Sequence, residues 1–359
     1  MKYDINISKT RDSKLAALDF NNIPFGHVFS DHMFVADYKE GAWQDLRIVP
    51  FQNFTMHPAN MTLHYSQTIF EGMKASKDVH NTPLLLEPHL HAQRLNHSAD
   101  RMCMPHVPEA LFLQALHELI SLDSDWIPPA NMEGSLYVRP YMFATDEFIG
   151  VKPSSTYKFV IFTCPVGAYY SKPVKLVTET TYVRAVNGAT GEAKAGGNYA
   201  ASLYPAQLAK QKGYDQVIWM ESPDFKKIQE VGTMNLFFVI GDTVITPATT
   251  GAILKGITRK NFLTILADKG IKTEARDIYI DEIIDAYKSG QLKEAFGAGT
   301  AAVVSHIAEI THDGFLMTLP SLEERTIGNM LKAEIDGLRA GTIEDKFGWL
   351  VPVKVPVNA

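Results

Sequence analysis

The segment that most constrains this chain runs from residue 192 to residue 235. Within it, Lys194 lies in a loop of alanine and glycine, where little side-chain bulk would hinder a ligand that approaches the lysine amine. Tyr199 follows, and Glu230 lies in a mostly apolar run, where an unpaired carboxylate would be costly. Taken one at a time, Lys194 is more simply a solvated loop lysine and Glu230 a strand-edge carboxylate facing water, because short motifs often match by chance.

Taken together, the three side chains suit one cofactor, pyridoxal phosphate (PLP). A lysine amine that has lost its proton can bond the cofactor aldehyde. A tyrosine can hydrogen-bond the phenolate oxygen of the ring, and a carboxylate beside the pyridine nitrogen keeps that nitrogen protonated, so that the ring can accept electrons. The segment is thus a candidate wall of a PLP site, with Lys194, Tyr199 and Glu230 as its candidate residues, and by itself it does not outweigh the simpler readings above.

Composition narrows the remaining choices. The chain has 359 residues, enough for two domains on a prior of roughly 150 residues each. A net charge of −6 disfavours a role on nucleic acid or on an anionic membrane. No apolar run reaches the roughly 18 residues that span a bilayer, and the start has no secretory pattern. The two cysteines form no disulfide framework and the histidines have no metal spacing, so we expect a cytoplasmic protein without a metal.

The expected elements do not alternate as regular βαβ units, which indicates an α+β fold. We expect hairpins around turns at 39–41 and 241–242, helices that begin at Pro88 and after Pro108, a helix over 199–212 that Pro205 bends or breaks, and a long helix over 321–338.

A change in the pattern of expected elements near the middle of the chain predicts two domains. Residues 167–173 read as a linker, with a smaller domain at 1–166 and a larger one at 174–359 that carries Lys194.

Two segments could bind a phosphate group. Gly256, Ile257 and Thr258 open an expected helix, whose free N–H groups and macrodipole favour an anion. Residues 297–300 (G-A-G-T) form a second expected turn of small residues. Neither segment has the spacing of a P-loop, and glycine turns before helices are common, so neither identifies a site by itself.

The N-terminal half offers further polar and aromatic groups. Tyr137 and Arg139 would share one face of a strand, because side chains alternate with period two, and this pair suits a carboxylate beside an aromatic wall. Arg94, on an expected helix, could serve a phosphate. The alternatives are a surface arginine and core tyrosines.

Six motifs occur along the chain in a recognisable order. They are H-Y-S-Q-T-I-F-E-G (64–72), S-L-Y-V-R-P (135–140), K-A-G-G-N-Y-A (194–200), E-V-G-T-M-N (230–235), G-I-T-R (256–259) and F-G-A-G-T-A (296–301). In these motifs the chain resembles the fold-type IV PLP aminotransferases, and among them the branched-chain amino acid aminotransferases. The resemblance implies a two-domain α+β fold like that of D-amino acid aminotransferase, an active site between the domains, and a homodimer.

The resemblance also implies roles for individual residues. Lys194 would bond the cofactor and act in catalysis. The implied cofactor-binding residues are Lys194, Arg94, Tyr199, Glu230, Thr233, Ile257, Thr258 and Thr300. The implied substrate-binding residues are Phe25, Tyr65, Phe70, Tyr137, Arg139, Tyr169, Thr300 and Ala301. The implied reaction is reversible transfer of an amino group between L-leucine, L-isoleucine or L-valine and 2-oxoglutarate, which gives branched 2-oxo acids and L-glutamate.

Two alternatives stay open at this point. A D-amino acid transaminase or an aminodeoxychorismate lyase would share Lys194 and Glu230 but differ in the substrate pocket. A metabolite-binding relative without catalysis is the third possibility, which the presence of both residues disfavours.

Overall fold

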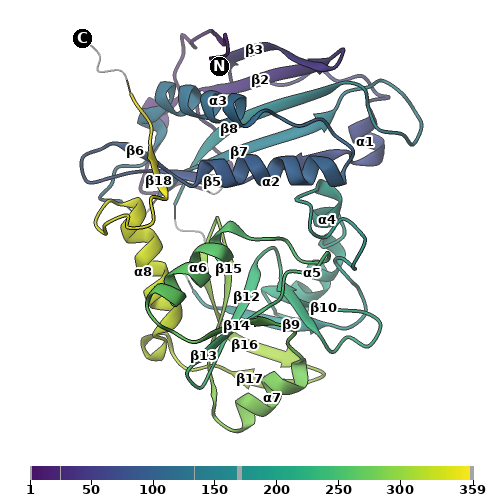
Figure 1. Cartoon of the computed structure of the whole chain (residues 1–359), viewed down its shortest axis with the longest axis vertical. Helices are drawn as coiled ribbons and strands as arrows, with labels where there is room; N and C mark the ends of the chain where they lie inside the picture. Colours follow the sequence, from purple (N-terminus) through teal and green to yellow (C-terminus); the bar gives the residue numbers. More distant parts are fainter. Residues whose placement is uncertain (1, 25, 133, 168–171, 356–359) are drawn as a thin grey trace. The chain divides into compact units, whose positions relative to one another are not determined.

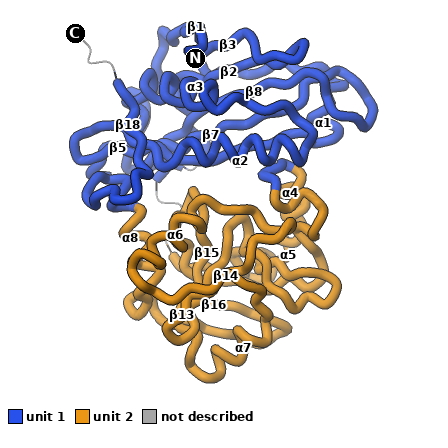
Figure 2. The backbone as a smooth tube through the Cα atoms, viewed as in Figure 1, with its two compact units in different colours: residues 1–169, 193–196, 336–359 blue, residues 170–192, 197–335 orange. Residues whose placement is uncertain are grey.

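The computed structural model describes residues 2–24, 26–132, 134–167 and 172–355. The chain forms two compact units, coloured separately in Figure 2. Unit 1 consists of Met1–Tyr169, Ala193–Gly196 and Asp336–Ala359, and unit 2 of Tyr170–Glu192 and Gly197–Ile335. The expected linker at 167–173 includes residues 168–171, which lie outside the described residues, and the division at 166 and 174 stays a prediction.

Figure 1 shows the sheet on which unit 1 is built. The sheet has nine strands, and among the described residues β1 and β3 pair in parallel while its other strand pairs are antiparallel. The strand order is β1-β3-β2-β8-β7-β5-β6-β18, and β4 also pairs with β7. The strands are β1 (Asn6–Ile7), β2 (His32–Lys39), β3 (Ala42–Pro50), β4 (Thr68–Phe70), β5 (Met73–Lys77), β6 (Pro83–Leu86), β7 (Ser135–Ala144), β8 (Tyr157–Val166) and β18 (Leu350–Pro352). The helices are α1 (Met61–Tyr65), α2 (Pro88–Arg101) and α3 (Glu109–Leu122), with 3-10 turns at Leu15–Ala17 and Ser124–Trp126.

The predicted hairpin at 39–41 is confirmed as β2 and β3. Glu40 and Gly41 both adopt positive φ, at 53° and 79°, as a turn that matches the twist of its strands requires. Strand β2 is buried on both faces. Phe34 packs in the cluster shared with α2 and α3, and Val35 packs in a second cluster on the opposite face.

Helices α2 and α3 begin where the sequence predicts. Pro88 occupies the first turn of α2, where a missing N–H breaks no hydrogen bond, and Pro108 is the N-cap residue of α3. Both helices lie along the sheet of unit 1 (Figure 1). Each buries an apolar stripe, so that Leu95 of α2 and Leu116 of α3 are fully buried in one core.

Unit 2 holds a second nine-stranded sheet, of mixed direction. Its order is β11-β10-β9-β16-β15-β12-β13-β14, and β17 pairs with β16. The strands are β9 (Val174–Glu179), β10 (Gln216–Met220), β11 (Ile228–Val231), β12 (Asn235–Ile240), β13 (Thr243–Pro247), β14 (Thr273–Arg276), β15 (Leu292–Gly299), β16 (Val303–His312) and β17 (Phe315–Thr318). The helices are α4 (Gly196–Ala200), α5 (Leu203–Gln211), α6 (Ile257–Asp268), α7 (Ile280–Lys288) and α8 (Ile327–Arg339), of which α4 and α8 each contain a unit boundary.

The predicted hairpin at 241–242 is confirmed as β12 and β13. Alternation along β12 separates two layers of core. Phe237 stacks on Phe296 and meets Phe262 of α6, whereas Phe238 packs with Ile283 of α7. Each unit combines helices with one sheet, and the two sheets are mainly antiparallel or mixed, so the predicted α+β class is confirmed.

Two predicted helix boundaries are wrong. The helix over 199–212 is interrupted after Ala200, before the proline, and Pro205 lies in the first turn of α5, where it is tolerated. The helix over 321–338 is two pieces, because Ser321 and Glu324 form a capping box around a 3-10 turn at Leu322–Glu324, and α8 begins only at Ile327. Among the described residues, none of the helices has the length and apolar character needed to cross a bilayer.

Candidate functional site

The segment that carries Lys194 packs with unit 1, although its neighbours on both sides belong to unit 2. The amide N–H of Lys194 donates to Ser98 Oγ at 3.0 Å, and its carbonyl accepts from the amide of Phe70 at 3.0 Å. Ala195 forms a β-bridge with Ile69. These contacts hold the lysine main chain from both sides, so the direction in which its side chain leaves the backbone is set by unit 1.

The Lys194 side chain lies beside the aromatic ring of Phe70, which also contacts the guanidinium of Arg139. Its Nζ is 4.8 Å from the centroid of the Phe70 ring, and Arg139 Cζ is 4.7 Å from the same centroid. Arg139 Nη2 also donates to Tyr137 Oη at 2.9 Å. Unit 1 thus brings together Lys194, Phe70, Tyr137 and Arg139, four of the residues that the sequence predicts.

Arg139 still has a donor to offer. Its Nε is buried and has no hydrogen-bond partner within the described part of the chain, although buried donors are normally satisfied. Tyr137 holds the guanidinium by one nitrogen, and Phe70 and Tyr137 flank it. This arrangement suits a carboxylate, which accepts two parallel hydrogen bonds from an arginine.

Tyr137 occupies space that Gly72 leaves free. A Cβ atom on Gly72 would lie 2.2 Å from Tyr137 Oη and 3.0 Å from its Cζ. Tyr137 is itself buried, with 8% of its surface exposed, and it pairs with Cys164 across β7 and β8. The glycine is therefore required by the close approach of the tyrosine.

Arg94 is held by a buried carboxylate that the sequence did not assign a role. Arg94 Nε and Nη2 donate to the two oxygens of Glu71 at 2.7 and 2.8 Å, and His91 Nδ1 donates to Glu71 Oε2 at 2.7 Å. Burial would raise the pKa of Glu71, but Arg94 and His91 outweigh it and hold that pKa well below its usual range. Burial lowers the pKa of His91, so its imidazole is neutral at pH 7. Glu71 thus sets the orientation of the Arg94 guanidinium.

In unit 2 the predicted Glu230 is buried, with 5% of its surface exposed, on β11. Arg184 Nη2 lies 2.6 Å from Glu230 Oε2, and Asn235 Nδ2 donates to Glu230 Oε1 at 3.1 Å. Arg184 also donates to the carbonyl of Ala252. The sequence pointed to neither partner; the one available signal was that a buried carboxylate needs a cation or several donors nearby.

The predicted phosphate segment at 256–258 opens α6. Gly256 is the N-cap residue, and Ile257 and Thr258 are the first two helical residues, so their N–H groups have no partner within the helix. The expected turn at 297–300 is placed differently. Gly297 and Gly299 belong to strand β15, where they make room for Met234, and the turn begins at Thr300.

The other predicted residues occupy varied places. Thr300 and Ala301 form a partly exposed turn before Val303, whose positive φ of 60° is strained for a β-branched residue. In unit 2, Tyr199 is half-buried in α4 and Thr233 is exposed between β11 and β12. Tyr65, in unit 1, ends α1 and packs against the core. Phe25 and Tyr169 lie outside the described residues.

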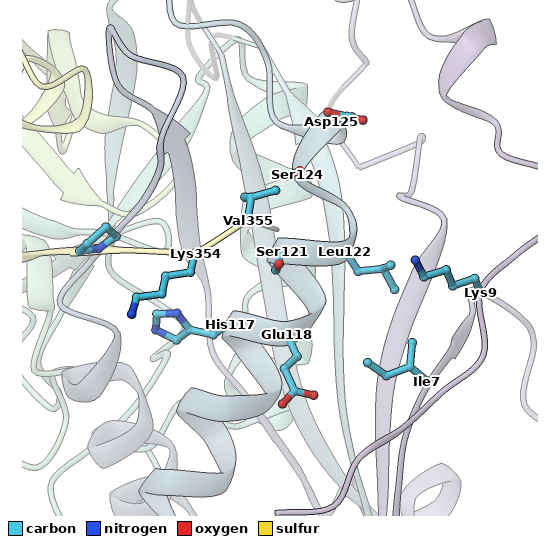
Figure 3. A pocket seen from close by; sticks show the side chains of 11 residues that line it. Ile7, Lys9, His117, Glu118, Ser121, Leu122, Ser124, Asp125, Lys354 and Val355 are labelled. Carbon is cyan, nitrogen blue, oxygen red and sulfur yellow. The ribbon is translucent and has the colours of Figure 1, made fainter. Parts of the chain in front are cut away.

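A separate hollow of about 720 Å³ lies on unit 1, over α3 (Figure 3). Figure 3 shows His117 and Ser121 of α3 in its floor, with Lys354 on one side and Ile7 on the other. It contains none of the predicted site residues. The candidate site therefore rests on the contacts described above.

The chain is similar to known proteins in both sequence and structure. Residues 68–310 match the model of the family described as amino-transferase class IV. The chain is 46% identical over 340 residues to branched-chain-amino-acid aminotransferase 2 of Bacillus subtilis (strain 168), covering 93% of each chain. It is 41% identical over 349 residues to a probable branched-chain-amino-acid aminotransferase of Staphylococcus epidermidis, covering 96% of this chain and 97% of the other.

Solved structures show the same fold. The crystal structure of the Escherichia coli branched-chain amino acid aminotransferase matches with a TM-score of 0.74 at 26% identity, covering 90% of this chain and 99% of the other. The PLP form of the enzyme from Thermobaculum terrenum matches with a TM-score of 0.69 at 21% identity, covering 90% and 98%, and supports the fold alone.

Proposed function

Because this chain belongs to the class IV aminotransferase family and, within it, to the branched-chain amino acid aminotransferases, we propose that it transfers amino groups between L-leucine, L-isoleucine or L-valine and 2-oxoglutarate. The observation that carries the proposal is the cluster in unit 1. A lysine amine lies beside an aromatic ring, and next to it Arg139 has a buried Nε that finds no hydrogen-bond partner among the described residues. Aromatic surface suits an aliphatic side chain, and the arginine suits the second carboxylate of glutamate.

The residues present fit PLP, the cofactor on which class IV aminotransferases depend. Lys194 offers an amine and Glu230 a buried carboxylate for the pyridine nitrogen. The N-terminus of α6 offers N–H groups for phosphate. Its N-cap residue is a glycine, at a position where neighbouring atoms exclude a side chain. When bound, PLP supplies a protonated ring that accepts the negative charge developing at the substrate Cα.

The side chains then divide the chemistry. Lys194 Nζ would hold the cofactor aldehyde and, once displaced by substrate, would remove the Cα proton as a general base. Glu230 would hold the proton on the pyridine nitrogen, with Arg184 and Asn235 fixing its carboxylate. The phosphate would be held by Arg94, Ile257, Thr258 and Thr300, and the ring by Tyr199 and Thr233.

The proposed substrate contacts follow the same residues. Tyr137 and the amides of Thr300 and Ala301 would bind the α-carboxylate, and Arg139 the distal carboxylate of glutamate. Tyr65 and Phe70, with Phe25 and Tyr169, would form the apolar wall. A homodimer and a cytoplasmic location remain predictions from the sequence.

The proposal is tested with purified protein supplied with PLP. We expect glutamate-dependent amination of 4-methyl-2-oxopentanoate to leucine, with ping-pong kinetics, and a visible absorption band that shifts when L-leucine is added. Faster pyruvate formation from D-alanine or from aminodeoxychorismate would instead identify one of the two related activities. Absence of both turnover and any spectral shift would leave a binding protein without catalysis.

Gly72→Ala should impair substrate binding through Tyr137. The new methyl group would displace the phenol and break its hydrogen bond with Arg139. We expect kcat/KM for leucine and glutamate to fall by about 10- to 100-fold, because misplaced binding groups lose transition-state contacts. Steady-state kinetics with both amino donors provides the measurement.

Gly251→Ala is the matched control, since a Cβ there would meet its nearest neighbour at 3.6 Å and should leave the kinetics unchanged. Wild-type kinetics in the Gly72 variant would show that Tyr137 does not contact the substrate.

A further inference from the structure

One buried side chain in unit 2 connects two parts of the proposed cofactor site. Asn235 is the first residue of β12, with 6% of its surface exposed. Its Nδ2 donates to Glu230 Oε1 at 3.1 Å and to the carbonyl oxygen of Leu254 at 3.0 Å. Leu254 lies two residues before Gly256, the N-cap residue of α6. Both amide hydrogens of Asn235 are therefore used, one toward the strand that carries the carboxylate and one toward the loop that opens the helix.

The other end of the same amide explains the glycine at the N-cap of α6. A Cβ atom on Gly256 would lie 1.9 Å from Asn235 Oδ1 and 3.1 Å from its Cγ. Gly256 has φ −68° and ψ 131°, a conformation open to every residue, so backbone freedom does not require glycine here. The close approach of Asn235 does. One hydrogen bond, to Leu254, and one steric limit, at Gly256, thus join the amide to the start of α6.

The amide suits this place for an electrostatic reason. Arg184 already supplies a positive charge to Glu230 Oε2, and Arg259 of α6, also buried, contributes a further attraction. A neutral donor at Oε1 orients the carboxylate without adding charge. Each carboxylate oxygen accepts more than one hydrogen bond, so Glu230 retains acceptor capacity for a ligand.

We propose that Asn235 is a positioning residue that fixes the spacing between the Glu230 carboxylate and the N-terminus of α6. A rigid ligand with a protonated pyridine nitrogen at one end and a phosphate at the other is then bound at both ends together. This deepens the proposed function and rests on it for the identity of the ligand. A pre-set spacing strengthens binding because the second contact forms without further loss of freedom.

The experiment compares two ligands that differ only in the phosphate. Apo-protein is titrated with PLP and with pyridoxal. The dissociation constant of pyridoxal divided by that of PLP measures how much the phosphate contributes to binding. In Asn235→Ala and in Gly256→Ala we expect this ratio to fall by about tenfold or more relative to wild type, because the phosphate contact is no longer held in register with the carboxylate contact. Asn235→Asp should behave similarly, since a carboxylate keeps the shape but cannot donate to Glu230.

Asn261→Ala is the matched control. Asn261 is a buried asparagine of α6, the helix that Gly256 caps. Neither its amide nitrogen nor its amide oxygen has a hydrogen-bond partner among the described residues. Its replacement should keep the wild-type ratio of PLP to pyridoxal affinity whatever it does to thermal stability. A general loss of structure would weaken both ligands by the same factor and would leave the ratio unchanged.

The outcomes separate the two proposals. If wild type catalyses transamination but the Asn235 and Gly256 variants keep its affinity ratio, the positioning role is wrong and the proposed function stands. If wild type shows no transamination but prefers PLP, and the variants lose that preference, the positioning role stands and the proposed function is wrong. If only the Asn235 variants fail to fold, Gly256→Ala decides the matter.

Discussion

Replacing Lys194 with alanine is expected to abolish transamination while the protein stays folded and still binds PLP. Alanine keeps the main-chain hydrogen bonds to Ser98 and Phe70, so the segment should remain in place on unit 1. What is lost is the amine that bonds the cofactor and moves the Cα proton. Removal of a positioned general base alone costs about 10²- to 10⁴-fold in rate, and we expect kcat to fall by at least about a thousandfold.

The measurement is leucine-dependent formation of glutamate from 2-oxoglutarate, alongside the affinity of apo-protein for PLP. Lys210→Ala, which removes an exposed lysine near the end of α5, is the control and should have wild-type kinetics. Borohydride reduction of the wild-type protein with PLP, followed by peptide mapping, should place the label on Lys194. Wild-type turnover in the alanine variant, or label on another lysine, would refute the assignment.

The second large effect is expected from Glu71→Gln in unit 1. Glutamine keeps the shape of the side chain but removes the carboxylate charge that the largely buried Arg94 guanidinium faces in an ion pair. Breaking a buried ion pair from one side costs about 3–5 kcal/mol of unfolding free energy. The affinity for PLP should also fall, because Arg94, the proposed phosphate ligand, would lose the contacts that orient its guanidinium.

This variant should also change the response of stability to acid. The pKa of Glu71 is lower in the folded protein than in the unfolded chain, so its stabilisation is complete above the unfolded pKa of about 4.3 and is lost as the pH falls below it. Burial lowers the pKa of His91 in the wild type and in the variant, so both proteins also lose some stability as the pH falls below about 6.5. Denaturant unfolding at pH 7 and at pH 3 should show a large difference between wild type and variant at pH 7 that narrows at pH 3.

Glu118→Gln provides the comparison. Glu118 is a half-buried glutamate of α3 that accepts a hydrogen bond from Gln114, and the described residues include no cation in an ion pair with it. Its replacement should change the unfolding free energy by less than about 1 kcal/mol at either pH. A Glu71 variant as stable as wild type at pH 7 would show that the cluster contributes little to folding.

Local sequence signals predicted the elements whose causes are local. The turn at Glu40 and Gly41 forms the hairpin of β2 and β3, and its two positive φ values concern those residues alone. Pro88 and Pro108 likewise affect only the helix starts at which they lie, and both predicted helices are present. The start of α8 depends instead on a distant residue. Glu294 of β15 accepts hydrogen bonds from the amides of Thr326, Ile327 and Gly328, and no local pattern reveals that contact.

The same limit applies to the candidate site. The sequence pointed to residues that would touch a ligand, because lysine, glutamate and glycine in these motifs have recognisable chemistry. It did not point to the residues that hold them. Glu71 orients Arg94, Ser98 holds the Lys194 main chain and Arg184 holds Glu230, each across more than twenty residues of chain, and Asn235 holds Glu230 from five residues away.

The interleaving of the two units also governs the order in which unit 1 can be completed during synthesis. Unit 1 takes the Lys194 segment from the middle of the chain and its last strand, β18, from Leu350–Pro352. When a ribosome has released only the first 169 residues, β6 therefore lacks the partner that covers its edge. Until translation reaches β18, that edge presents free N–H and C=O groups to other nascent chains. The first unit to emerge is thus the last to be finished.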